Sequence, residues 1–124
     1  MKIMLIIFII GSIIMGVKLK MEDRQLEEIS IADINLKDIR DGDYYGECLL
    51  ELTTAKVNVE VKDGIIKNIE LVQHNHGPGY GADEMIKRII DSQSLDVDAV
   101  TGATKSSIVM KKAIENALEK GINN

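Results

Sequence analysis

The chain has 124 residues, which is room for one domain, and a net charge of −5 at pH 7. Its 28% charged and 45% hydrophobic residues exclude a chain disordered by composition and one wholly embedded in a membrane. We expect no nucleic-acid partner, because the chain is acidic and carries only three tyrosines and one phenylalanine. The single cysteine, Cys48, excludes an internal disulfide and a cysteine-rich metal cluster.

An uncharged run near the start of the chain, residues 3–17, lies between lysines. As a helix this run is roughly 22 Å long, which is short for the hydrocarbon core of a bilayer, about 30 Å thick. The apolar stems of the lysines that follow can extend it. We interpret residues 1–20 as a membrane signal-anchor, because no small-residue cleavage site and no lipid-accepting cysteine follow. A cleaved signal peptide and a buried core helix are the alternatives. Residues 21–39, of mixed charge, read as a linker or a short helix before a domain at residues 40–124.

The first half of that domain has the pattern of an antiparallel meander. An Asp-Gly-Asp turn precedes a candidate strand over residues 44–52. In residues 56–62 three valines alternate strictly with polar side chains, which indicates a half-buried strand. An Asp-Gly pair then leads into a second apolar run, residues 65–72, and such a pair is a strong hairpin signal because the tight turn needs positive φ. We therefore expect about three strands.

The second half has the pattern of two helices. A loop rich in glycine, residues 73–81, holds the only proline of the chain. From Ala82 the apolar spacing predicts a helix that ends near Ser92. A short extended piece and a turn lead to a second amphipathic helix, for which Gly121 is a natural stop. The order of elements predicts an α+β domain, with a small antiparallel sheet packed with two main helices behind an N-terminal hydrophobic helix.

Hydroxyl side chains gather at the start of the second helix, in the segment Thr101-Gly102-Ala103-Thr104-Lys105-Ser106-Ser107. The free N–H groups and the positive dipole end of a helix start favour an anion such as phosphate. The two small residues in the segment let a bulky partner approach the backbone. The alternative is that the hydroxyls only cap the helix.

The segment that runs from Asp98 through Ala99 and Val100 to Thr104 resembles the motif of the FMN-binding domain family. That motif runs Asp, two residues, Ser or Thr, Gly, Ala, Thr, and the match is complete. The similarity extends over residues 40–120, and includes the strand pair and the loop at residues 74–81. Members of the family occur in periplasmic subunits of sodium-pumping NADH:quinone oxidoreductases and of Rnf-type complexes, and in small membrane-anchored proteins.

The resemblance implies a covalent flavin. In such domains the last Thr of the motif, here Thr104, carries FMN through a phosphoester that a dedicated flavin transferase makes from FAD with Mg²⁺. Asp98 then belongs to the segment that the transferase recognises, whereas an ordinary turn carboxylate is the alternative. The remaining candidates for FMN contact around Thr104 are Thr101, Gly102, Ala103, Lys105, Ser106 and Ser107.

The flavin ring needs an apolar wall with polar edges. Tyr80 is a candidate for ring contact, and Met85 is another, with core packing as its alternative. His76 is a candidate for a contact to the flavin or for a hydrogen bond within the loop. We expect no metal at His74 and His76, because no carboxylate or cysteine ligands are arranged near them.

These features together predict a membrane-anchored, extracytoplasmic electron-transfer protein whose partners are a flavin transferase and membrane redox proteins. We expect an electron-transfer module more than an independent enzyme, and we assign no catalytic residue. One alternative is a small flavin-dependent reductase, which steady turnover of an acceptor would indicate, with His76 as the only tempting acid. The other is a module that binds FMN or another phosphorylated ligand non-covalently at Thr104, and loses it on denaturation.

Overall fold

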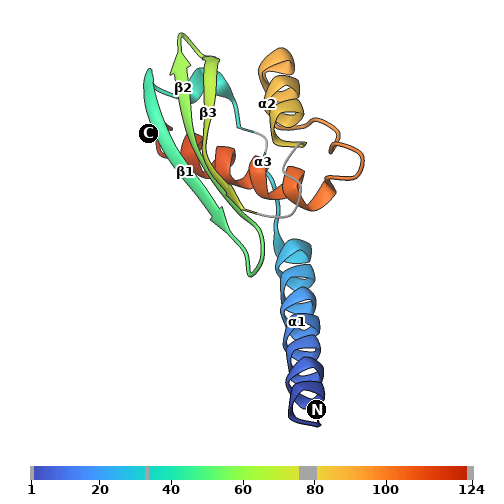
Figure 1. Cartoon of the computed structure of the whole chain (residues 1–124). Helices are drawn as coiled ribbons and strands as arrows, with labels where there is room; N and C mark the ends of the chain where they lie inside the picture. The colour runs from blue at the N-terminus through green and yellow to red at the C-terminus, as the bar shows by residue number, and fades with distance from the viewer. Residues whose placement is uncertain (1, 33, 76–80, 123–124) are drawn as a thin grey trace.

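A computed structural model describes residues 2–32, 34–75 and 81–122. A three-stranded antiparallel sheet in the order β1-β2-β3 is covered on one face by helices, and a long first helix projects away from it (Figure 1). This architecture confirms the expected α+β class. The elements in chain order are α1 (Lys2–Glu28), the 3-10 helix η1 (Leu36–Asp38), β1 (Gly42–Leu49), β2 (Thr54–Lys62), β3 (Ile65–Asn75), α2 (Gly81–Ser92) and α3 (Thr104–Glu119).

The β2–β3 hairpin is the element whose sequence signal is strongest, and it forms at the Asp-Gly pair. Asp63 and Gly64 both have positive φ, at 55° and 73°, as the tight turn requires. The three alternating valines of β2 face the core with at most 1% of their surface exposed. Strand β3 extends to Asn75, three residues beyond the expected end, because its last residues pair with the start of β2.

Helix α3 supplies much of the core. Gly46 of β1 lies so close to the backbone of Ala113 that a Cβ atom would overlap its carbonyl oxygen. The glycine therefore lets helix and strand pack in close contact. Each fully buried Ile or Leu side chain in this layer contributes about 1.5–3 kcal/mol to stability. The buried apolar side chains of α3 are Val109, Met110, Ala113, Ile114, Ala117 and Leu118.

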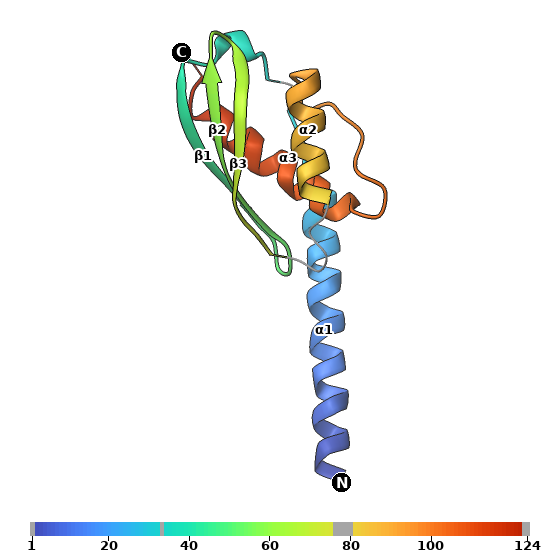
Figure 2. The same cartoon turned by 45° about the horizontal axis from the view of Figure 1, so that its top comes forward.

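Helix α1 has two parts that differ in environment. The apolar side chains of residues 3–17 are exposed, and in both views this part stands clear of the domain (Figures 1 and 2). By length and composition α1 is long and apolar enough to cross a membrane. A signal sequence can be equally long and apolar. The end of the helix instead contacts the domain, where Glu22 is 1% exposed and accepts a hydrogen bond from the N–H of Leu52 at 3.2 Å. The first part of the segment expected as a linker or short helix is thus the end of α1.

Candidate functional site

Helix α3 begins at Thr104, the residue that the family motif singles out. Thr104 is exposed, and the N-cap residue before it is Ala103, which has φ −135° and ψ 38° and makes no side-chain capping bond. Alanine has no polar side chain with which to satisfy the first N–H groups of a helix. The start of α3 is therefore a place where an anion meets backbone donors and the positive end of the helix dipole.

The two serines that follow are buried inside the fold. Ser106 is 3% exposed and Ser107 is 2% exposed. The Ser107 hydroxyl donates to the carbonyl of Ala103 at 2.7 Å and accepts from the N–H of Val100 at 3.1 Å. Ser107 thus ties the turn at residues 100–103 to the first turn of the helix, a role that the sequence pattern does not indicate.

Glycines shape the site in two ways. Gly102 has φ +81°, and a Cβ added there would meet nothing within 4 Å. Glycine is therefore favoured at this position by the backbone conformation and not by a lack of space. A Cβ added at Gly81 would lie 2.5 Å from the Cβ of Ala103. This close approach brings the start of α2 against the start of α3, so that two helix N-termini converge beside Thr104.

Lys105 faces the end of α1. Its Nζ lies 3.2 Å from Oε2 of Glu22 and 3.4 Å from Oδ1 of Asp23. The sequence suggests Lys105 as a contact for the phosphate of FMN, but its ammonium is already held by two carboxylates. Glu22 could not be found from the sequence, because its partner lies 83 residues away and no local pattern marks the pair.

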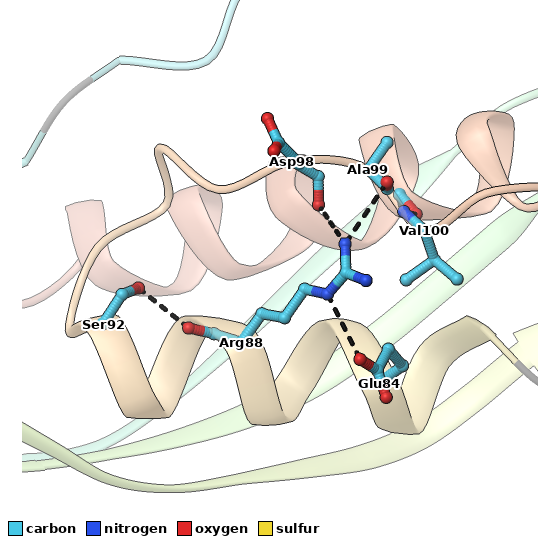
Figure 3. A network of polar contacts seen from close by, with 7 residues as sticks. Glu84, Arg88, Ser92, Asp98, Ala99 and Val100 are labelled. Atoms are coloured by element: carbon cyan, nitrogen blue, oxygen red, sulfur yellow. Dashed lines mark hydrogen bonds and ion pairs between the residues drawn. The ribbon is translucent and has the colours of Figure 1, made fainter.

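A network of polar contacts holds the loop before Thr104, as Figure 3 shows. Nη1 of Arg88, on α2, donates to the carbonyl oxygen of Asp98 at 2.9 Å and to that of Ala99 at 3.3 Å. Nε of Arg88 pairs with Oε1 of Glu84 at 3.3 Å. The residue Asp98 itself is exposed. The loop backbone is therefore bound to α2 at the residue that the motif begins with.

The remaining candidates are placed as follows. Thr101 is exposed. Met85 is fully buried in the core, which agrees with core packing, the alternative to a contact with the flavin ring. Tyr80 and His76 lie outside the described residues. Within the described part of the chain, no group of three or more His, Cys, Asp or Glu side chains could hold a metal ion. Burial raises the pKa of the Cys48 thiol, which the nearby Lys112 ammonium offsets in part, so a reactive thiolate is disfavoured.

A protein-family model for the FMN-binding domain matches residues 53–119. The chain belongs to the FMN-binding domain family. The match runs from the start of the sheet's central strand to the end of α3, and so includes Asp98, Thr104 and Arg88. The resemblance seen in the sequence is confirmed, and FMN is the ligand that the family supports.

One solved structure similar to the chain is that of the CPE2226 protein from Clostridium perfringens. It shares 27% sequence identity with the chain, with a TM-score of 0.55, and the match covers 67% of this chain and 88% of that one. None of the curated proteins searched matches the chain. The described residues around Thr104 fit the phosphate end of FMN, because an exposed hydroxyl stands at a helix start whose N-cap residue, Ala103, makes no side-chain capping bond.

Proposed function

We propose that this FMN-binding domain is a membrane-anchored, extracytoplasmic electron carrier whose FMN is linked by a phosphoester to Thr104. The single observation that carries the proposal is the position of Thr104: an exposed hydroxyl on the first residue of α3, at the end of the complete family motif. When bound, FMN supplies one- and two-electron transfer. The contribution of the chain is to hold the phosphate and to position the flavin.

The bond is made in trans by a flavin transferase that uses FAD and Mg²⁺. The Thr104 oxygen forms a bond to the FMN phosphorus of FAD, the bond from that phosphorus to the bridging oxygen breaks, and AMP leaves with the electron pair. The hydroxyl proton goes to a base of the transferase, since a Thr hydroxyl is a weak nucleophile without one. The Lys105 side chain beside Thr104 is directed to Glu22 and Asp23 instead.

The end of α1 supports a location of the flavin near a membrane surface. The apolar run ends at Val17, and Glu22, which contacts Lys105 beside the attachment residue, comes five residues later. Five residues of helix rise about 7.5 Å. If the apolar run lies in the bilayer, the start of α3 is held close to the interface, where membrane redox proteins can reach a bound flavin.

Co-expression of the full chain with a flavin transferase, followed by denaturation in SDS, tests the proposal. We expect a fluorescent band heavier by one FMN less water in the wild type, a dark band at the unmodified mass for Thr104→Ala, and labelling for Thr104→Ser. A known substrate domain labelled in parallel is the control. Retention of flavin by denatured Thr104→Ala contradicts the site. Loss of all flavin from the denatured wild type indicates the non-covalent module, and steady turnover of an acceptor by the purified protein indicates the reductase.

A further inference from the structure

The loop that leads into Thr104 has no regular structure between Leu95 and Ala103, yet its backbone is held by side chains from two helices. Arg88 of α2 binds two successive carbonyls, those of Asp98 and Ala99. Lys111 of α3 donates to the carbonyl of the residue before them, Val97. Hydrogen bonds from charged donors are the stronger kind.

Both backbone groups of Val100 are also bound. The N–H of Val100 donates to the Ser107 hydroxyl at 3.1 Å, and the carbonyl of Val100 accepts from the N–H of Ala103 at 2.9 Å. In contrast, Asp98, Thr101 and the attachment residue Thr104 are exposed. Side chains of α2 and α3 therefore hold the backbone of the segment before Thr104, while the polar side chains of that segment are exposed to solvent.

Arg88 is the member of this set that lies farthest outside the motif in sequence. It reaches the loop from ten residues before Asp98, and its Nη1 bonds to the two carbonyls while its Nε pairs with Glu84 (Figure 3). The planar guanidinium can make these contacts at once, whereas a lysine ammonium is a single point donor. Without Arg88, the carbonyls of Asp98 and Ala99 would accept hydrogen bonds from water instead. The loop would then be less ordered in the free protein, and a binding partner would have to order it.

We propose that Arg88 is a positioning residue for flavin attachment: it holds the Asp98–Thr104 backbone in the conformation that the flavin transferase binds. The inference rests on the proposed function, since it concerns the same covalent step at Thr104. The physical reason is pre-organisation, because a protein substrate whose recognition segment is already ordered loses less conformational freedom on binding. Arg88 takes no part in the chemistry, so its effect falls on recognition of the acceptor and not on the bond-making step.

The test compares initial rates of flavin attachment to the full chain and its Arg88 variants, with purified transferase, FAD and Mg²⁺. For Arg88→Met, which keeps the length of the stem and loses every donor, we expect kcat/KM to fall about ten- to a hundredfold, in line with loss of hydrogen bonds from a charged group. The change should appear as a higher KM for the acceptor chain with kcat retained. Arg88→Lys should recover part of the loss.

Two neighbouring substitutions serve as matched controls. Glu84→Gln removes the ion pair to Nε and leaves both bonds to the loop, so labelling should stay at the wild-type rate. Lys87→Gln changes the charge of an exposed neighbour on the same helix and should also have no effect. Hydrogen exchange of the amides at residues 98–103 should become faster in Arg88→Met and stay unchanged in both controls.

The possible results separate the two proposals. Labelling of Arg88→Met at the wild-type kcat/KM overturns the positioning role and leaves the covalent attachment standing. An unlabelled wild type, beside a labelled substrate domain, overturns both. If Arg88→Met also unfolds at a lower temperature, the Arg88→Lys variant decides. An Arg88→Lys variant that unfolds at the same temperature as the wild type and recovers part of the KM supports the role. An Arg88→Lys variant with wild-type kinetics and fast hydrogen exchange at residues 98–103 contradicts it.

Discussion

The two segments that meet at Thr104, the loop at residues 95–103 and helix α3, are held in the fold by different forces. Helix α3 is held by apolar packing, with Val109, Met110 and Ile114 fully buried against the sheet and α2. The loop is held by hydrogen bonds to its backbone, chiefly from Arg88 and Lys111. Apolar burial is non-directional and supports the whole domain, whereas hydrogen bonds to a loop fix one local conformation.

This difference separates two kinds of substitution. A change on the buried face of α3 should lower the free energy of unfolding and leave the conformation of the motif in the remaining folded molecules intact. A change at Arg88 should alter the motif with little effect on global stability, since a side chain that is 36% exposed packs few core atoms. Substitutions in α3, at the end of α1 and in the loop test whether global stability and the conformation of the motif can be changed separately. The substitution with the largest expected effect on stability comes first.

Leu118→Ala should produce the largest loss of stability. Leu118 is 1% exposed, and removal of a buried leucine side chain costs about 2–5 kcal/mol. Thermal unfolding of the full chain in detergent measures the change, with Glu119→Ala, an exposed position at the end of the same helix, as the control. The folded fraction should accept flavin at the wild-type rate. A fall in that rate comparable to the one expected for Arg88→Met would show that the two segments are not independent.

Glu22 and Asp23 provide a smaller and more closely matched comparison, because both carboxylates face Nζ of Lys105. The Glu22 side chain is 1% exposed and the Asp23 side chain is 66% exposed. Glu22→Ala leaves the N–H of Leu52 without its acceptor, which costs about 1–3 kcal/mol. Asp23→Ala removes a solvent-screened pair, worth about 0–1 kcal/mol.

The measurement for this pair is again the unfolding temperature of the full chain. A larger drop for Glu22→Ala indicates that the end of α1 is part of the folded domain and is seated at the start of α3. Equal drops for the two variants would mean that burial of Glu22 adds nothing, and that the end of α1 is not docked on the domain in solution.

The parts of the molecule that could be predicted are those with local signals. The Asp63-Gly64 turn and the alternating valines of β2 predict a hairpin because the backbone geometry depends on adjacent residues alone. The second amphipathic helix likewise follows from its apolar spacing, although the sequence places Thr104 in the turn before it and the helix begins at Thr104 itself. Local sequence is therefore sufficient to place the motif just before or at a helix start.

The contacts that surround the motif could not be predicted, for a physical reason. Arg88 and Lys111 bind backbone carbonyls, which every residue carries, so no partner residue type in the sequence marks the contact. Lys105 pairs with Glu22 across 83 residues, and in sequence both resemble solvated surface charges. Ser107 is a candidate for phosphate contact or for capping, and neither pattern indicates that its hydroxyl binds the backbone on either side of the turn.

Gly102 isolates the conformation of the loop from its packing. Because φ is +81° and a Cβ would meet nothing within 4 Å, Gly102→Ala adds backbone strain of about 1–2 kcal/mol without any overlap. Gly102→Asn should cost less, since asparagine adopts the left-handed region more readily. If unfolding temperatures follow the order glycine, asparagine, alanine, the positive φ is the reason for glycine at this position. If the two variants unfold at the same temperature, the positive φ is not the reason for glycine at this position. Labelling rates that fall equally for the two variants, whatever their unfolding temperatures, would indicate that the transferase requires a position without a side chain.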